Sequence, residues 1–136
     1  MYYANKMGLA PGDQIVEFIT PLGITKHFAM YAGWDENGVE WIIENQKFAG
    51  VRLVEARQHF QSVLKIDRIE KLQGSNAQRK QVVQNALAKL GKEYNLLNYN
   101  CEHFITESTT GMAQSSQVKT AFGILIASLI ISALID

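Results

Sequence analysis

The stretch Asn98–Phe104, NYNCEHF, contains the single cysteine of the 136-residue chain. A helix is predicted over residues 100–111, with Asn100 able to cap its N-terminus and Glu102 in its first turn. At Cys101 the sulfur then lies at the first turn, where unpaired backbone amides and the helix dipole stabilise a thiolate. The stretch therefore suggests a nucleophile, although a lone cysteine is more commonly a small buried hydrophobic residue.

A cysteine nucleophile requires a base, and the chain offers three histidines. His103 is two residues from Cys101, so on a helix the two side chains point in nearly opposite directions. His59 lies in a polar segment and is predicted to be solvated. His27 begins an alternating strand in which Ala29 and Tyr31 share its face, so it is the candidate base, with a half-buried structural histidine as the alternative.

The pattern of apolar residues predicts an early group of strands followed by helices, which is an α+β fold. Strands are expected in residues 11–20, 26–34 and 38–45, one or two more in 49–60 and 62–69, and helices over 76–91 and 100–111. The first helix can be capped by Ser75 or Asn76 and ends at Gly91.

Composition restricts the function further. The chain carries 13 basic and 13 acidic side chains, and this balance argues against nucleic acid as a partner. A single cysteine excludes an intramolecular disulfide and fits a reducing compartment. The N-terminus does not resemble a secretory signal, so the catalytic domain is expected to face the cytoplasm. Neither a cofactor nor a metal is expected.

A change in composition divides the chain into a domain over residues 1–118 and a tail over 119–136. Residues 121–135 carry no charged side chain and are apolar on every helical face, which favours a membrane-associated tail. As a helix this segment is about 22 Å long, short of a hydrocarbon core of roughly 30 Å, so a buried or partner-binding helix is the alternative.

Taken together, PGD at residues 11–13, H-x-A-x-Y-x-G at residues 27–33 and NCEHF at residues 100–104 resemble the lecithin:retinol acyltransferase-like (LRAT domain) family. The chain is most similar to the small phospholipase A/acyltransferase branch, also called H-Ras-like suppressors, and the resemblance extends into the hydrophobic tail. NCEHF is the specific motif, and the other two are confirmatory.

The resemblance implies an NlpC-type fold, a permuted form of the papain design, with a small antiparallel sheet packed against helices. It implies that Cys101 is the nucleophile and His27 the general base. Such enzymes cleave a fatty acyl ester of a glycerophospholipid through a thioester and transfer the acyl group to water, an amine or a hydroxyl. The expected partners are therefore a phospholipid substrate, an acyl acceptor and a membrane reached through the tail.

The third catalytic group departs from that branch, which carries a second histidine on the next strand in a V-V-H setting. Here the matching stretch WIIENQ places Glu44 after two isoleucines, with Asn45 following. Either side chain can accept a hydrogen bond from an imidazole and orient it. Alignment selects Glu44, on the strand face of Ile42, and Asn45, on the face of Ile43, is the alternate.

Two other functions stay open on the sequence alone. One is a thiol amidase or peptidase of the same broad fold, and the other is a membrane adaptor that has lost turnover. The aromatic residues of the strand region are expected to be mostly core or edge packing, and some could meet lipid: Trp34, Trp41, Phe48 and Phe60.

Overall fold

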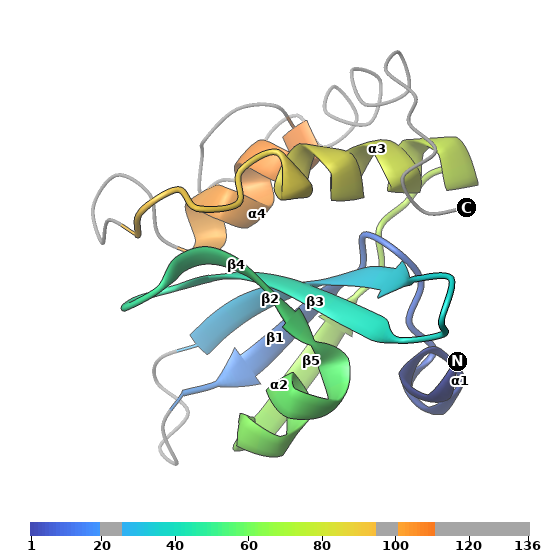
Figure 1. The fold of residues 1–136 in the computed structure, drawn as a ribbon, viewed down its shortest axis with the longest axis horizontal. Helices are drawn as coiled ribbons and strands as arrows, with labels where there is room; N and C mark the ends of the chain where they lie inside the picture. The colour runs from blue at the N-terminus through green and yellow to red at the C-terminus, as the bar shows by residue number, and fades with distance from the viewer. Residues whose placement is uncertain (20–25, 95–100, 111–136) are drawn as a thin grey trace.

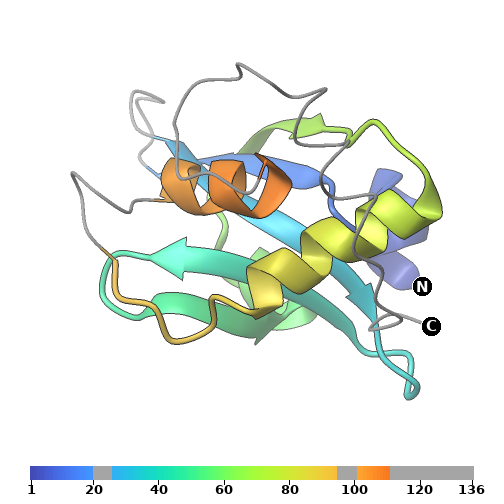
Figure 2. The same ribbon diagram turned by 90° about the horizontal axis from the view of Figure 1, so that it is seen from above.

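The computed structural model describes residues 1–19, 26–94 and 101–110, which form one antiparallel sheet with helices on both faces (Figures 1 and 2). The predicted α+β class is confirmed. In chain order the elements are α1 (Tyr2–Met7), β1 (Gln14–Phe18), β2 (Lys26–Trp34), β3 (Glu40–Gln46), β4 (Gly50–Glu55), α2 (Ala56–Ser62), β5 (Lys65–Glu70), α3 (Asn76–Leu87) and α4 (Cys101–Thr110).

The sheet has five strands in the order β4-β3-β2-β1-β5, and each pair of neighbours is antiparallel. Strand β2 lies at its centre and coincides with the predicted strand over residues 26–34. Its alternation directs Met30 and Ala32 to one face and Ala29 and Tyr31 to the other. Because both faces of β2 are buried, the histidine at its start is held on a rigid central element.

Two hydrophobic clusters cover the two faces of the sheet. The first packs α3 and α4 against β2 and β3, with Phe104 fully buried between the layers. Figure 2 shows α3 and α4 side by side over this face. The second cluster packs α1 and α2 on the opposite face through Leu9, Ala56 and Phe60. The result is a central sheet with a helical layer on each side.

Helix α3 begins with a reciprocal capping box. The Ser75 side chain accepts a hydrogen bond from the backbone amide of Gln78, and the Gln78 side chain accepts one from the amide of Ser75. The predicted N-terminus is confirmed, whereas the helix ends at Leu87, before the predicted stop at Gly91. The residues between Leu87 and Gly91 continue as hydrogen-bonded turns.

The PGD motif ties the start of β1 to α3. The Asp13 carboxylate is fully buried and accepts hydrogen bonds from the amides of Ala10 and Leu72 and from the side chains of Lys71 and Arg79. Burial opposes ionisation, but these donors outweigh it and lower the pKa of Asp13. The motif is thus an anchor in the fold, remote from the cysteine in sequence.

Two helices were missed from the sequence. Helix α2 occupies residues within the predicted strand over 49–60, where only the first half, β4, is extended. Its N-cap residue Glu55 makes no side-chain capping bond, so the usual start signal is missing. Helix α1 also begins without a side-chain cap and is fixed by its contact with Glu40, whose carboxylate accepts hydrogen bonds from the amides of Tyr3 and Ala4.

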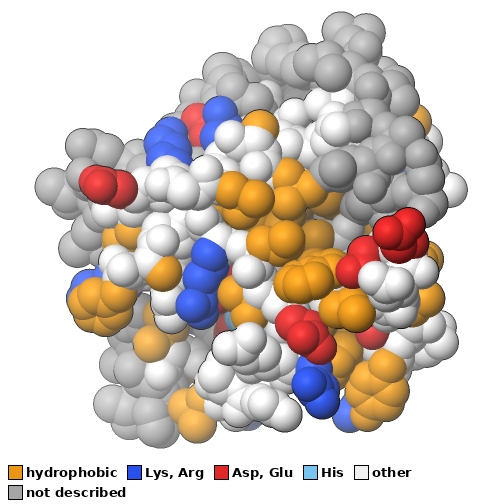
Figure 3. All heavy atoms as spheres, viewed as in Figure 1, with side chains coloured by type: hydrophobic (Ala, Val, Ile, Leu, Met, Phe, Trp, Pro, Cys, Tyr) orange, Lys and Arg blue, Asp and Glu red, His pale blue; other side chains and the backbone are white. Residues whose placement is uncertain are grey.

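Strand β4 forms one edge of the sheet. Its edge is partly covered by the chain after α3, because Val51 exchanges backbone hydrogen bonds with Gly91 and Lys92. On the face drawn in Figure 3, hydrophobic side chains gather between the helical layer and this strand, with charged side chains around them. Leu53 of β4 is 39% exposed.

The predicted tail over residues 119–136 lies outside the described residues, as does the predicted cap Asn100. Within the described part of the chain, no helix combines the length and apolar character that crossing a membrane requires.

Candidate active site

The site is centred on a histidine and a carboxylate on neighbouring strands. In the β2–β3 register Ala29 lies opposite Glu44, which places His27 and Glu44 diagonally on one sheet face. Nε2 of His27 lies 2.7 Å from Oε1 of Glu44, and Glu44 is only 3% exposed. A buried carboxylate at this distance fixes the orientation of the imidazole ring.

Cys101 is the first residue of α4, as the sequence predicts, and its side chain is partly exposed. The thiol interacts with the ring of His27 closely enough to contribute to the raised pKa of the imidazole. Since Nε2 of this ring faces Glu44, Nδ1 is the nitrogen left for the sulfur. The three residues Cys101, His27 and Glu44 therefore form a linked series in which the imidazole lies between a thiol and a carboxylate.

The electrostatics of this series favour a charged imidazole. Burial lowers the pKa of His27, but hydrogen bonds to Cys101 and Glu44, together with their negative charges, raise it to about 10. Burial alone would raise the pKa of Glu44, yet the hydrogen bond from His27, the charges of His59 and His27, and Arg52 lower it to about 2. Near neutral pH, Glu44 is ionised and His27 is protonated.

Four charged side chains lie in a row across the sheet. Glu17 is directly opposite His27 in the β1–β2 register, and Arg52 is directly opposite Glu44 in the β3–β4 register. Nε and Nη2 of Arg52 lie 2.8 and 2.7 Å from Oε2 of Glu44, a bidentate contact to one carboxylate oxygen. The row alternates in sign and leaves Oε1 of Glu44 for His27.

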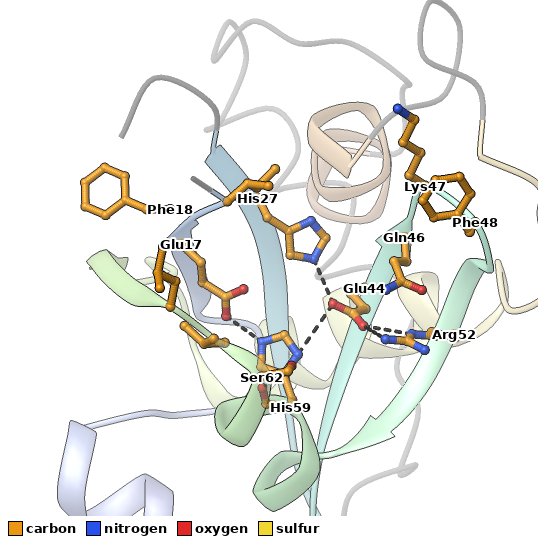
Figure 4. A pocket seen from close by; sticks show the side chains of 13 residues that line it. Glu17, Phe18, His27, Glu44, Gln46, Lys47, Phe48, Arg52, His59 and Ser62 are labelled. Carbon is orange, nitrogen blue, oxygen red and sulfur yellow. Dashed lines mark hydrogen bonds and ion pairs between the residues drawn. The ribbon is translucent and has the colours of Figure 1, made fainter. Parts of the chain in front are cut away.

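His59 lies over this row, and the prediction that it is solvated is wrong. It is 4% exposed, with Nε2 at 2.5 Å from Oε2 of Glu17 and Nδ1 at 3.4 Å from Oε1 of Glu44 (Figure 4). Its element, α2, covers the sheet face that carries His27. His59 therefore bridges two buried carboxylates, and one of them is the partner of His27.

The alternate third group, Asn45, takes the opposite strand face. Asn45 is fully buried, and its neighbour Ile43 belongs to the cluster under α3 and α4, whereas Ile42 belongs to the cluster on the face of Glu44. The structure brings Glu44, and not Asn45, to the ring of His27. The side chain of His103 lies outside the described part of the structure.

A pocket opens beside the imidazole. It has a volume of about 350 Å³, at the lower end of the range for small-molecule sites. His27, Glu44 and His59 line its inner part, and Phe48, Leu64 and Ile19 line it from three different segments. Among the described residues, no cluster of three or more histidine, cysteine or acidic side chains is arranged to bind a metal ion.

Sequence reasoning missed the contributions of Glu17, Arg52 and His59. Arg52 and Glu17 depend on strand register, which short strands do not specify well from sequence. For His59 a local signal exists, because Ala56, His59 and Phe60 recur at helical i, i+3, i+4 spacing and all three lie toward the sheet. That spacing places His59 on the inner face of a short helix.

A comparison with protein families gives one match. The model described as lecithin retinol acyltransferase matches residues 8–114, a range that contains the thiol, the imidazole and the carboxylate described above. The match identifies a family and not a branch within it. No curated protein and no solved structure gives a match.

Proposed function

The chain belongs to the lecithin retinol acyltransferase family, and we propose that it is a thiol-dependent phospholipase A and acyltransferase acting on glycerophospholipids. The observation that carries this proposal is the imidazole of His27, which lies 2.7 Å from the carboxylate of Glu44 and interacts with the thiol of Cys101 at the start of α4. This is the arrangement that nucleophilic cysteine catalysis requires.

The first half-reaction starts from the ion pair in which the proton of the Cys101 thiol is already held at Nδ1 of His27, since the ring is protonated near neutral pH. The thiolate attacks the carbonyl carbon of a fatty acyl ester, and the carbonyl oxygen becomes an oxyanion. Collapse of this intermediate breaks the bond to the glycerol oxygen, which leaves with the proton held by His27. The products of this half-reaction are a lysophospholipid and an acyl thioester on Cys101.

In the second half-reaction His27 removes a proton from the acceptor, which is water, an amine or a hydroxyl. The acceptor attacks the thioester, and the sulfur leaves as a thiolate paired with the imidazolium. Transfer to water completes hydrolysis, and transfer to an amine or alcohol completes acyl transfer. Both half-reactions use the same ring nitrogen, and the proton that left with the glycerol oxygen is replaced by the proton taken from the acceptor.

Glu44 is the proposed orienting group, in the position where the related branch carries a second histidine. Its carboxylate accepts a hydrogen bond from Nε2–H of His27, which fixes the tautomer that leaves Nδ1 facing the sulfur. Its negative charge also stabilises the imidazolium formed in each half-reaction. A carboxylate can orient the ring, as the second histidine of that branch would, and it adds a full negative charge that a histidine does not carry.

The N-terminus of α4 supports the oxyanion. Because α4 begins at Cys101, the first backbone amides of the helix lack intrahelical partners and are located next to the nucleophile. We further propose that the enzyme is held on a membrane by the tail over residues 119–136, with its catalytic domain on the cytoplasmic side.

The decisive experiment is detection of the thioester. The full chain is mixed with vesicles of mixed phospholipids, quenched with acid and digested, and the peptide containing Cys101 is examined by mass spectrometry. We expect a mass increase equal to a fatty acyl group, removed by hydroxylamine at neutral pH. Absence of the adduct, together with absence of lysophospholipid, would contradict the proposal.

The matched control is Cys101→Ser, which changes volume little and removes the thiolate. We expect no lysophospholipid from this variant and an unchanged circular dichroism spectrum. Turnover by the folded serine variant would exclude the thioester route. A thiol amidase would instead release amine from peptide substrates, and an adaptor would be unaffected by the loss of the thiol.

A further inference from the structure

Three separate segments each present an exposed apolar side chain around the pocket beside His27. Ile19 follows β1 and is 52% exposed, Phe48 lies in the turn between β3 and β4 and is 89% exposed, and Leu64 precedes β5 and is 58% exposed. All three line the same pocket. We define these three residues as the rim of the pocket.

Single exposed apolar residues are ordinary on protein surfaces, but their convergence on one opening is not. Phe48 in particular lies in the turn between β3 and β4, where the backbone conformation would accept a polar residue equally well. Figure 4 shows Phe48 and Phe18 on opposite sides of the pocket, with His27 and Glu44 between them. The opening is thus apolar on two sides of the charged centre.

Lysines accompany the aromatic residues of this region. Nζ of Lys47 lies 5.6 Å from the ring centre of Phe48, and Nζ of Lys26 and Lys65 lie 5.5 and 5.7 Å from that of Phe18. A lysine whose stem covers an apolar ring can place its ammonium group at a polar boundary. Lys26 is also paired with Asp67, so Lys47 and Lys65 are the cations to test.

We propose that the rim is an interfacial docking surface for an anionic phospholipid bilayer. Apolar side chains enter the headgroup region, and the lysines contact anionic headgroups. This inference rests on the proposed function, since the pocket inside the rim is lined by His27 and would receive an acyl ester directly from the bilayer. It concerns the catalytic domain itself and is distinct from anchoring by the tail.

The first test compares two substrates in the full chain. One is a phospholipid in vesicles with or without phosphatidylserine, and the other is a short-chain ester dissolved below its aggregation concentration. For Phe48→Ser and Leu64→Ser we expect the ratio of vesicle turnover to soluble-ester turnover to fall about tenfold each. For Lys47→Gln combined with Lys65→Gln we expect the enhancement by phosphatidylserine to be lost.

Leu90→Ser is the matched control, because Leu90 is 43% exposed and does not line the pocket. We expect this variant to keep the wild-type ratio. An unchanged ratio in both rim variants would overturn the proposal, and so would an equal loss on both substrates, which would indicate a role in the reaction itself. If the wild type were dimeric without vesicles and Phe48→Ser were monomeric, the rim would instead bind a second copy of the chain.

A second test does not depend on turnover. Phe48→Trp places a fluorophore on the rim, and Leu90→Trp places one at the control position. With brominated phosphatidylserine vesicles we expect quenching of the emission added at position 48 and none of that added at position 90. Quenching without activity would support the docking surface and contradict the proposed enzymatic function. Activity without quenching would support the enzymatic function and contradict the docking surface.

Discussion

Nε2 of His27 lies 2.7 Å from Oε1 of Glu44, although the two residues are on different strands and 17 positions apart in sequence. The contact arises from the β2–β3 register, which sets Ala29 opposite Glu44 and leaves the histidine diagonal to it. The second oxygen of the carboxylate is taken by Arg52. Glu44 therefore orients the proposed base, His27, through one carboxylate oxygen and is paired with Arg52 through the other.

The first prediction concerns substitutions of Glu44. Glu44→Gln keeps an acceptor for the ring proton but loses the charge, so it should slow acylation of Cys101 less than Glu44→Ala, which loses both. We expect the loss in Glu44→Ala to be the larger of the two, and up to about ten-thousandfold, the size of the loss when the orienting carboxylate of a catalytic triad is replaced. Single-turnover acylation at fixed pH measures both, and circular dichroism verifies folding.

Two further variants make this series discriminating. Glu44→His should restore part of the activity lost in the alanine variant, because the related branch carries a histidine at the matching position. Asn45→Ala should be mild for acylation, since Asn45 lies on the other strand face. A severe loss in Asn45→Ala with near-normal Glu44→Ala would assign the orienting role to the amide.

The second prediction is an alkaline limit to acylation. The pKa of His27 is about 10, because the thiol and Glu44 raise it against the effect of burial. Above that pH the ring loses the proton that the leaving glycerol oxygen needs, so the rate should fall. In Glu44→Gln one cause of the raised pKa is removed, and the limit should move to lower pH. A pH–rate profile of both proteins measures the shift, and an unmoved limit would contradict the role of Glu44.

The strands that carry His27 and Glu44 were the most predictable part of the fold. Alternation over residues 26–34 predicted β2 with its observed bounds and assigned His27 to the face of Ala29 and Tyr31. The same alternation places Glu44 and Asn45 on opposite faces of the strand. Buried strands have a strict period of two, so face assignments follow from sequence even where partners do not.

His59 shows why the rest could not be predicted. Its flanking residues Gln58 and Gln61 are exposed, which makes the segment look solvated. Its actual partner Glu17 is 42 positions away, and the contact exists only because α2 folds back over the sheet. The helical spacing of Ala56, His59 and Phe60 indicates that His59 faces inward, but nothing in the local sequence identifies Glu17 as its partner.

The third prediction tests the bridge made by His59. His59→Phe keeps a ring of similar size but leaves the buried carboxylates of Glu17 and Glu44 without it, so stability should fall by about 3 kcal/mol. Glu17→Gln in the same chain should recover part of this loss, because one unpaired charge is removed. Urea unfolding of the two single variants and the double variant gives the coupling, which we expect to exceed about 1 kcal/mol.

The same variant should also alter catalysis. The charge of His59 contributes to the lowered pKa of Glu44, and Glu44 in turn raises the pKa of His27. Loss of that charge should therefore change the pH profile of acylation by the folded protein at low temperature. A profile identical to wild type would limit His59 to a structural role.

The last prediction concerns Asp13 of the PGD motif. Asp13→Asn keeps the shape of a fully buried side chain but removes the charge that faces Lys71 and Arg79, so it should cost about 3 kcal/mol of stability. Because the pKa of Asp13 is lowered in the folded state, its contribution is present above the ordinary aspartate pKa and is lost as the pH falls through the folded value. The difference in stability between wild type and variant should therefore shrink on acidification.

Glu55→Gln, which affects an exposed pair with Arg57 at 3.7 Å, is the control and should cost less than about 1 kcal/mol at any pH. Urea midpoints across the acid range test both, and a cost for Asp13→Asn no larger than the control would show that the motif does not anchor α3 to β1.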